Sequence, residues 1–379
     1  MWYFDKLQRS YPKRDQKLTR ELLNLNSLSS GEDQPQLNPL YEVGKNLRDN
    51  CLAEYKDKFL NSPYEVLIHL PPTSISPGGN SLFHNMGESF KHLGIAVRYF
   101  WDNLPEIKFD NSKVYLVLTS FNEVYRKRMD WELISKLENK NKLYIGSTFP
   151  FHHHSIADIP SDLQVWLKAD NRFLYSFYNE KFVMDSVIGK YALSENRRIY
   201  SIEFGANPLY HFPDKYINHC TDYIFLGSAN HDKIGRYYQY FHNAFKQFKG
   251  VVAGPGWDWI TDYEIKPGRD RFLYSKAKVA INLHIDMQIS NPCELNERTY
   301  ILAACGIPQV VDRPLLLDSY FVKVGHVANN PEEYINSIEH VLKNYDEAIQ
   351  CAENAMIEVF EKHTTFSRID KLLKNIALD

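Results

Sequence analysis

Residues 277–312 read AKVAINLHIDMQISNPCELNERTYILAACGIPQVVD, and this stretch decides the fold. Its segment VAINLH (279–284) is an apolar run with the length of a buried strand. A polar loop follows, then a helix predicted at 296–304 that ends in Ala-Ala-Cys-Gly, and then a second strand at 308–311. Strands that are apolar throughout and are separated by helices predict a parallel sheet covered on both faces.

The start of this predicted helix has the features of an anion site. A helix N-terminus offers N–H groups and a partial positive charge, which suit a diphosphate. Glu294 and Glu297 lie three residues apart there, beside Asn296 and Arg298. The two carboxylates could bond ribose or sugar hydroxyls, or they could act only as helix caps. The residues alone leave both roles open.

The same alternation of strands and helices extends over most of the chain. Strands are predicted, in chain order, at 64–70, 95–100, 114–119, 143–146, 173–177, 199–204, 222–226 and 251–253. Helices are predicted between them, including 122–137, 179–188 and 233–248, and Asn330-Pro331 has the residues of a helix start. We therefore expect a fold of the α/β class.

The length of the chain and one interruption of this pattern predict the domain organisation. At roughly 100–200 residues per domain, 379 residues suggest two domains. Residues 205–216, GANPLYHFPDKY, contain one Gly and two Pro and lack periodicity, so they are predicted to link the halves. We expect a helical extension at 1–62, domains at 63–207 and 208–360, and a C-terminal helix at 361–379 that could pack back on the first domain.

The composition narrows the function classes. Hydrophobic residues make up 44% and charged residues 24% of the chain, as in ordinary globular proteins. The formal net charge of −3 argues against a dedicated binder of nucleic acid or of anionic membranes. Residues 1–20 carry six basic side chains against two acidic ones, which could form a phosphate-facing arm. A solvated N-terminal segment is the simpler interpretation.

The cysteines and the apolar runs suggest a compartment. The five cysteines are scattered and form no CxxC pair, which disfavours both a disulfide framework and a zinc site. No stretch approaches the roughly 18 uninterrupted apolar residues that a transmembrane helix needs. We expect no transmembrane segment and a reducing, cytoplasmic location. The oligomeric state has no signal in the sequence.

Two glycine-containing turns follow strands in the second half. Gly227-Ser228 and Gly254-Pro255-Gly256 could let the backbone approach a phosphate closely, although neither is a complete GxGxxG motif or P-loop. Lys233 and Arg236, on the helix after the first turn, could neutralise a diphosphate or could simply be solvated. Trp257 could stack on a nucleobase or could pack in the core.

Two loops of the first half also follow strands. The loop PPTSISPGGN (71–80) contains Gly78, Gly79 and Asn80. His152-His153-His154 follows the strand at 143–146, and one of these histidines could act as general base or touch a sugar. The alternative is that they are surface or capping histidines, because three adjacent histidines do not have the spacing of a zinc site.

The motifs taken together resemble the GT-B glycosyltransferases. The similarity is to the branch that includes the spore-maturation-protein (CgeB) type and, more distantly, to the retaining family with an E-x7-E motif. It rests on AKVAINLH (277–284), LNERTYILAACGIPQVVD (295–312), EFGANPLYHFP (203–213) and DYIFLGS (222–228). Asn296, Arg298, Cys305, Pro308 and Asp312 fall on positions of the family pattern. The first half resembles the family only in architecture.

The resemblance implies a fold and a reaction. The fold would be two Rossmann-like, doubly wound domains that face a central cleft, with a nucleotide-sugar domain at 208–360 and an acceptor domain at 63–207. The reaction would move a sugar from a nucleoside diphosphate (UDP, GDP or dTDP) to a hydroxyl of a glycan, lipid, protein or small molecule. No metal or other cofactor is expected, because the helix start at 295–298 and basic side chains would stabilise the leaving diphosphate.

The residues and the resemblance together give a candidate site. Predicted to bind the donor are Gly227, Ser228, Lys233, Arg236, Gly256, Trp257, His284, Asn296, Glu297 and Arg298. Predicted for catalysis are His153, His154 and Glu294, and predicted for the acceptor or cleft loop are Gly78, Gly79 and Asn80. His284 is included because it is the last residue of VAINLH, and this position would place it near the sugar phosphates.

One position departs from the family pattern. The second glutamate of E-x7-E would stand four residues before Cys305, where this chain has Ile301, and the first would fall on Cys293, next to Glu294. Glu297, one helical turn earlier, could hold the ribose instead. Alternatively, the protein could be a degenerate, non-catalytic nucleotide binder on a GT-B scaffold, or a nucleotide-sugar epimerase. A sugar transferase that acts on DNA is a narrower option, which the net charge disfavours.

Overall fold

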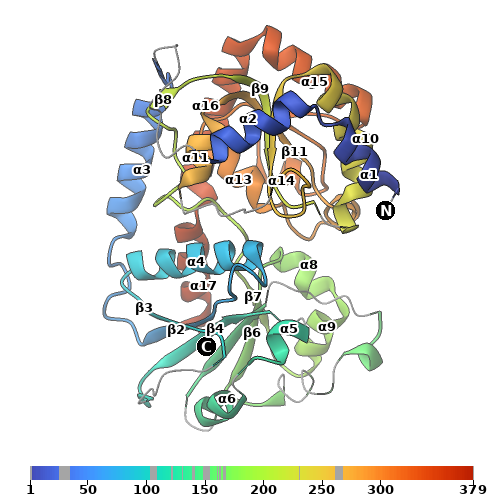
Figure 1. The fold of residues 1–379 in the computed structure, drawn as a ribbon. Coiled ribbons are helices and arrows are strands. Elements are labelled where there is room, and N and C mark those ends of the chain that lie inside the picture. Colours follow the sequence, from blue (N-terminus) through green and yellow to red (C-terminus); the bar gives the residue numbers. More distant parts are fainter. Residues whose placement is uncertain are drawn as a thin grey trace. The chain divides into compact units, whose positions relative to one another are not determined.

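The computed structural model describes residues 2–24, 35–102, 109–120, 123–129, 131–138, 141–147, 154–159, 161, 164, 168–229, 231–260 and 268–378. The chain forms two compact units (Figure 1). Met1–Cys51 and Pro208–Thr364 make the first, which we call the five-stranded unit after its sheet. Leu52–Asn207 and Thr365–Asp379 make the second, the six-stranded unit. The predicted boundaries at 62 and 360 stay predictions.

The sheet of the six-stranded unit is parallel throughout. Its order is β3 (Ala96–Phe100), β2 (Tyr64–His69), β4 (Val114–Thr119), β5 (Leu143–Ser147), β6 (Arg172–Ser176) and β7 (Ile199–Ser201). Its helices are α4 (Pro77–His92), α5 (Glu123–Arg126), α6 (Trp131–Glu138), α8 (Glu180–Asp185), α9 (Val187–Ser194) and α17 (Thr365–Ile376). A short 3-10 helix spans Ile156–Asp158. The strand order reverses between β2 and β4, where a ligand crevice is expected at the carboxyl ends.

The main sheet of the five-stranded unit has the same kind of reversal. Its parallel strands run in the order β10 (Gly250–Ala253), β9 (Thr221–Leu226), β11 (Ala277–Asn282), β12 (Gln309–Val311) and β13 (His326–Val327). The later helices are α10 (His231–Gln247), α11 (Arg269–Tyr274), α12 (Asp286–Ser290), α13 (Glu297–Ala304), α14 (Leu317–Tyr320), α15 (Pro331–Lys343) and α16 (Tyr345–Lys362). β1 (Gln36–Leu37) pairs with β8 (Tyr216–Ile217) in a separate antiparallel ladder. The reversal here lies between β9 and β11.

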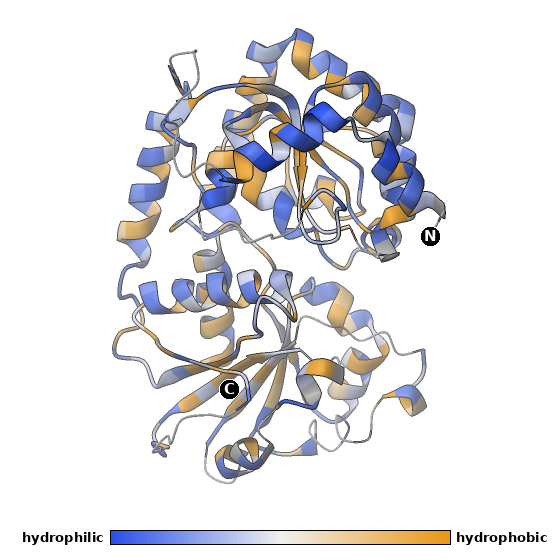
Figure 2. Cartoon of the chain, viewed as in Figure 1, coloured by the Kyte–Doolittle hydropathy of each residue, from blue (hydrophilic) through white to orange (hydrophobic). Residues whose placement is uncertain are grey.

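Local sequence explains most of these elements. The strands are apolar runs, and Figure 2 shows hydrophobic strands with more hydrophilic helix surfaces in both units. α15 begins as predicted: Asn330 accepts a hydrogen bond from the Glu333 N–H, and Pro331 takes the first helical position. α16 was missed, because its buried face is lined partly by alanines such as Ala348 and Ala352, which give a weak hydrophobic pattern.

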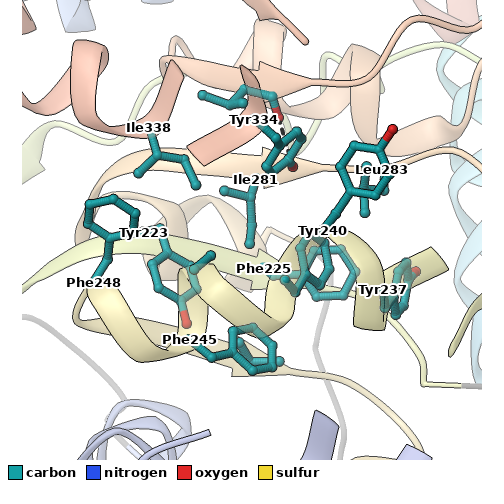
Figure 3. Packing of buried hydrophobic residues seen from close by; sticks show 14 of the residues in the cluster. Tyr223, Phe225, Tyr237, Tyr240, Phe245, Phe248, Ile281, Leu283, Tyr334 and Ile338 are labelled. Atoms are coloured by element: carbon teal, nitrogen blue, oxygen red, sulfur yellow. Dashed lines mark hydrogen bonds between the residues drawn. The ribbon is translucent and has the colours of Figure 1, made fainter. Parts of the chain in front are cut away.

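The core of the five-stranded unit is aromatic (Figure 3). Phe225 on β9 meets Tyr237 and Phe241 on α10 edge-on, at ring-centroid distances of 5.2 and 4.9 Å. Tyr334 on α15 packs against the same helix, and its hydroxyl donates to the carbonyl groups of Asn282 and Val310. Aromatic residues make up 14% of the chain, and many of them in this unit belong to the core, since their rings fill the space between α10, the sheet and α15.

The N-terminal helices complete this unit. α1 (Trp2–Ser10) packs beside α10, and α2 (Lys13–Asn24) lies along β10. Leu7 and Tyr11 are buried, and the Tyr11 hydroxyl donates to the Gly250 carbonyl at 2.8 Å and accepts from the Val252 N–H at 3.0 Å. These bonds cover the exposed edge of β10. The expectation of a solvated N-terminal segment is wrong, because the basic residues alternate with an apolar face that docks.

None of the helices within the described ranges has the length and the apolar character that crossing a membrane would require.

Candidate functional site

Arg298 lies at the point where the strand order of the five-stranded unit reverses. It is the second residue of α13, and its Nε donates to the carbonyl of Leu226, the last residue of β9, at 2.8 Å. Its Nη1 donates to Oδ1 of Asn282, the last residue of β11, at 3.1 Å. The guanidinium also lies over the Phe225 ring, 4.4 Å from its centroid. One side chain therefore bridges the carboxyl ends of two strands that flank the reversal.

The surroundings of Arg298 leave its positive charge uncompensated. Its two hydrogen-bond acceptors on these strands, a carbonyl and an amide oxygen, are neutral. Among the residues that the structure describes, no carboxylate lies within ion-pair distance of Arg298. Gly227 makes room for the group, because a Cβ at that position would overlap Arg298 Nη2. A half-buried cation therefore lies beside the Gly227 turn at the reversal point.

A buried polar network supports the start of α13. Asp312 follows β12, and its Oδ1 lies 2.6 Å from His284 Nδ1 while its Oδ2 accepts from Arg236 Nη2 at 2.8 Å. His284 Nε2 lies 3.1 Å from Thr299 Oγ1. His284, Asp312 and Thr299 are each no more than 1% exposed. Both ring nitrogens of His284 are engaged within the protein, so its predicted contact with the donor stays a prediction.

The network explains why Arg236 and Arg298 differ in the charge that they can present to a ligand. Burial raises the pKa of Asp312, but His284 and Arg236 lower it more, so the pKa lies below its ordinary value and the group is a carboxylate. Asp312 therefore largely neutralises Arg236, whose Nη1 is also 3.7 Å from Asp286. Arg298 has no such partner in the described residues. Of the two predicted donor-binding arginines, Arg298 has the charge to offer an anion.

Asn296 caps α13 and ties it to β11. Its Oδ1 accepts from the Thr299 N–H at 3.0 Å, as expected for an N-cap residue. Its Nδ2 donates to Asn282 Oδ1 and to the Leu283 carbonyl, each at 3.0 Å. These bonds fix the helix N-terminus at the edge of the sheet.

The two glycine turns pack against each other. The Gly227 N–H donates to the Ala253 carbonyl, and the Ala229 N–H donates to the Pro255 carbonyl, each at 2.8 Å. Gly256 has φ +87°, and a Cβ there would overlap the Ala229 carbonyl oxygen. The loops after β9 and β10 therefore form one surface, and only glycine allows this approach.

Trp257 belongs to the core beneath these loops. It is 1% exposed, its Nε1 donates to the Gly227 carbonyl at 2.9 Å, and its ring packs on Tyr237 and Trp259. The predicted stacking on a nucleobase is wrong for this conformation, because both ring faces are covered by other side chains. The packing alternative holds. Ser228 and Lys233 remain at the loop surface, where Lys233 Nζ donates to Ser228 Oγ at 3.4 Å.

The acidic residues near α13 have different settings. Glu294 is buried, and its Oε1 accepts from Gln288 Nε2 at 2.7 Å. Glu297 is the first residue of α13 and is half-buried. Ile301 packs against the cluster that contains Leu302 and Cys305, so an apolar contact occupies the position of the family's second glutamate. The catalytic role of Glu294 and the donor contact of Glu297 stay predictions.

The remaining candidates lie in the six-stranded unit. Gly78, Gly79 and Asn80 are in the first turn of α4, where Ser76 Oγ accepts from the Gly79 N–H and Asn80 Nδ2 donates to the Pro71 carbonyl. His154 is exposed, and His153 lies outside the described residues. The roles predicted for these residues stay predictions.

Sequence reasoning missed Asn282, Thr299 and the supporting role of Asp312. Asn282 had a signal, since it is a polar residue inside an otherwise apolar strand. Thr299 had no signal, and Asp312 had only its place in the family pattern, because their partners are distant in sequence. No group of three or more His, Cys, Asp or Glu residues within the described part of the chain is placed to hold a metal ion.

Comparisons with known proteins concern the fold and the second half of the chain. Residues 236–374 match the family model described as glycosyl transferase-like. The fold is similar to that of T4 phage β-glucosyltransferase, solved in complex with its substrate UDP-glucose, with a TM-score of 0.53 and 12% identity over 83% of this chain and 98% of that one. Sucrose-phosphate synthase from Thermosynechococcus elongatus gives a TM-score of 0.52 and 10% identity over 83% and 99%.

No curated protein matches the chain by sequence. At 10–12% identity, the structural matches show the fold alone. The finer assignments to the spore-maturation type and to the retaining branch stay predictions. Residues 236–374 therefore resemble a glycosyl transferase-like family, and the fold is that of the GT-B glycosyltransferases.

Proposed function

We propose that the five-stranded unit binds a nucleoside-diphosphate sugar at the reversal between β9 and β11, and that the chain transfers the sugar to an acceptor hydroxyl. The observation that carries the proposal is Arg298, a cation that bridges the ends of both strands without a carboxylate partner in the described residues. An unpaired, half-buried guanidinium is costly unless an anion completes it. In a nucleotide-sugar donor, that anion would be the diphosphate.

The neighbouring elements support the same ligand. The N-terminus of α13 points its first N–H groups toward this end of the sheet, and its partial charge favours an anion. The packed loops at Gly227 and Gly256 would let the nucleotide approach the backbone. Ser228 lies on the first of these loops, and Lys233 lies in the first turn of α10. We propose these residues, with Glu297, as the donor contacts.

The leaving group would be stabilised by this chain's own cations. When the bond between the anomeric carbon and the diphosphate breaks, negative charge develops on the leaving oxygen. Arg298 and the start of α13 are already fixed in position, so they can stabilise that charge without reorganising. We propose on this ground that no metal ion is needed.

The acceptor half of the reaction is proposed from position alone. Gly78, Gly79 and Asn80 lie at the start of α4 in the six-stranded unit, at the carboxyl end of its sheet. Glu294 is the carboxylate nearest in sequence to the donor helix, and its bond from Gln288 fixes its orientation. His153, His154 and Glu294 are the proposed general bases, and a glycan, lipid, protein or small molecule is the proposed acceptor.

Thermal unfolding in the presence of nucleotides tests the proposal. A ligand that binds only the folded state raises its stability by mass action, by about 2.7 kcal/mol at one hundred times its Kd. We expect UDP, GDP or dTDP to raise the melting temperature, and EDTA to leave that rise unchanged. UDP-glucose is the first donor to assay for hydrolysis. The absence of stabilisation by all three nucleotides would refute the proposal.

A non-catalytic nucleotide binder is the second candidate, and Ile301 favours it. At the position of the family's second glutamate this chain has an apolar contact with the core. This candidate predicts stabilisation by a nucleotide without hydrolysis or transfer from any nucleotide sugar. Interconversion of free nucleotide sugars without an acceptor would instead indicate an epimerase.

A further inference from the structure

One buried side chain of the N-terminal helix reaches the glycine loop that follows β10. Gln8 on α1 is 5% exposed. Its Nε2 donates to the Gly256 carbonyl, and its Oε1 accepts from the Asp258 N–H, each at 3.2 Å. The side-chain amide therefore satisfies two backbone groups on either side of Trp257, from a residue about 250 positions earlier in the chain.

The loop has two anchored sides. The side facing β9 is held by bonds within the second half of the chain, from the Ala229 N–H to the Pro255 carbonyl and from Trp257 Nε1 to the Gly227 carbonyl. The outer side is held by Gln8. Gly254 and Gly256 both have positive φ, at +145° and +87°. Glycines in such conformations have many alternatives, so ordering them costs more conformational entropy than ordering other residues.

Because the loop is exposed, losing the Gln8 bonds should affect the order of the loop more than the stability of the whole protein. Gly256 and Asp258 are exposed, so water can replace the Gln8 amide at both backbone groups when the side chain is removed. The cost to global stability is then small. The cost to loop order is larger, because two fixed hydrogen bonds are replaced by mobile ones.

We propose that Gln8 is a positioning residue for the donor: it holds the Gly256–Asp258 backbone in the conformation that receives the nucleoside diphosphate. This inference rests on the proposed function, nucleotide-sugar binding by the residues around Arg298. It makes the N-terminal helix part of the donor site without any contact to the donor.

The variant Gln8→Met tests the proposal, because it keeps an unbranched side chain of similar length and removes both hydrogen bonds. We expect the Kd for UDP and the KM for a nucleotide-sugar donor to rise roughly 3- to 10-fold, as the loss of one to two ordinary hydrogen bonds predicts, with kcat nearly unchanged. Gln8→Glu keeps an acceptor for the Asp258 N–H, but it places a carboxylate oxygen against the Gly256 carbonyl and adds a negative charge beside the proposed diphosphate, so its Kd should rise at least as much as that of Gln8→Met.

Tyr11→Phe is the matched control on the same N-terminal segment. It removes bonds to Gly250 and Val252, which lie inside β10, and leaves the loop bonds in place. We expect Tyr11→Phe to lower the melting temperature more than Gln8→Met does and to leave the Kd for UDP unchanged. If Gln8 had only a structural role, Gln8→Met would lower the melting temperature more than Tyr11→Phe does and would leave the Kd for UDP unchanged.

Hydrogen exchange of the Asp258 amide gives a readout that needs no ligand. Its rate should rise in Gln8→Met under native conditions and should not rise in Tyr11→Phe. If the wild type fails to bind UDP, the proposed function fails, and unchanged exchange at Asp258 would separately overturn the role of Gln8. If the wild type binds UDP and Gln8→Met binds it with the same Kd, the positioning role is overturned.

Discussion

The two parallel sheets reverse their strand order in the same way, but the side chains at the two reversals differ in charge. In the five-stranded unit, Arg298 joins the ends of β9 and β11 through a carbonyl and an amide oxygen. In the six-stranded unit, His69 ends β2, and its Nδ1 lies 3.0 Å from Oγ1 of Thr119, the last residue of β4. Its Nε2 lies 3.0 Å from the Trp101 carbonyl, and its ring stacks on Phe100.

This difference shows that topology and chemistry are set separately. Burial lowers the pKa of His69 to about 4, against smaller opposing effects of the Trp101 carbonyl and Asp102, so the ring is neutral at pH 7. Nε2 then carries the proton toward the carbonyl, and Nδ1 accepts from the Thr119 hydroxyl. The fold places strand ends apart at both reversals, and the residue that fills the gap decides whether an anion is attracted.

The largest expected effect comes from the network behind Arg298. Asp312→Asn removes the buried partner of Arg236 and leaves only the exposed Asp286 at 3.7 Å, and breaking a buried pair costs roughly 3–5 kcal/mol. Because the pKa of Asp312 is lowered in the folded protein, its contribution is present above the ordinary pKa of 3.8 and is lost as the pH falls through the lowered value. Urea unfolding at pH 7 and pH 3 should show a larger loss in the wild type than in the variant, in which other carboxylates with lowered pKa, such as Asp270, still titrate.

Asp318→Asn is the control for this measurement, because the Arg313–Asp318 pair is exposed. Its removal should cost less than about 1 kcal/mol. Equal effects of the two substitutions would show that the network does not organise the reversal of the five-stranded unit.

The next effect concerns the charge itself. Arg298→Gln should weaken UDP binding roughly 10- to 100-fold, which corresponds to the 1.5–3 kcal/mol of a hydrogen bond to a charged group. Arg298→Lys keeps the charge, but a single ammonium cannot hold Leu226 and Asn282 as the planar fork does, so we expect a partial loss. Isothermal titration calorimetry measures both values.

Arg313→Gln removes a surface charge in the same unit and should leave the Kd for UDP unchanged. Circular dichroism confirms that each variant is folded. If Arg298→Gln binds UDP as tightly as the wild type does, the contrast between the two reversals has no functional meaning.

The third effect concerns His69, at the strand-order reversal of the six-stranded unit. The pKa of His69 is lower in the folded protein than in the unfolded chain, so unfolding takes up a proton between pH 6.5 and about 4. The free energy of unfolding of the wild type should therefore fall as the pH drops through this range. His69→Phe keeps the ring stack and removes the His69 share of that dependence, whereas His219, whose pKa burial also lowers to about 4, keeps its share. The loss of two buried hydrogen bonds costs about 1–3 kcal/mol. Denaturant titrations at pH 7 and pH 4.5 give the change in the free energy of unfolding with pH for each protein. An identical change in the wild type and in His69→Phe would contradict the lowered pKa of His69.

The smallest effect compares two adjacent glycines at the start of α4. A Cβ on Gly79 would overlap the Tyr125 hydroxyl, whereas a Cβ on Gly78 would meet nothing within 4 Å. Gly78→Ala should stabilise the protein by about 0.4–1 kcal/mol through the unfolded chain, and Gly79→Ala should destabilise it. Melting temperatures measure both. Equal shifts would mean that the acceptor-side loop is not packed as described.

Particular residues show which features could be predicted from the sequence. The strand at 114–119 was predicted with its bounds, because its apolar run reads as buried from local pattern alone. The cap at Asn330 was predicted because its partners are three residues away. Trp257 was left open, since an aromatic residue after a glycine turn can pack or stack. The docking of Leu7 and Tyr11 was not expected, because their partners lie some 240 residues later.

The sequence by itself determined the α/β class, most of the strands and the helix start at Asn296, because these depend on neighbours within a few residues. It also identified Arg298 as a candidate. Only the tertiary structure decided that Arg298 bridges β9 and β11, that Asp312 neutralises Arg236, and that Gln8 holds the loop after β10. Charge at a site depends on which groups meet in space, and residues far apart in the chain meet only once the sheet has assembled.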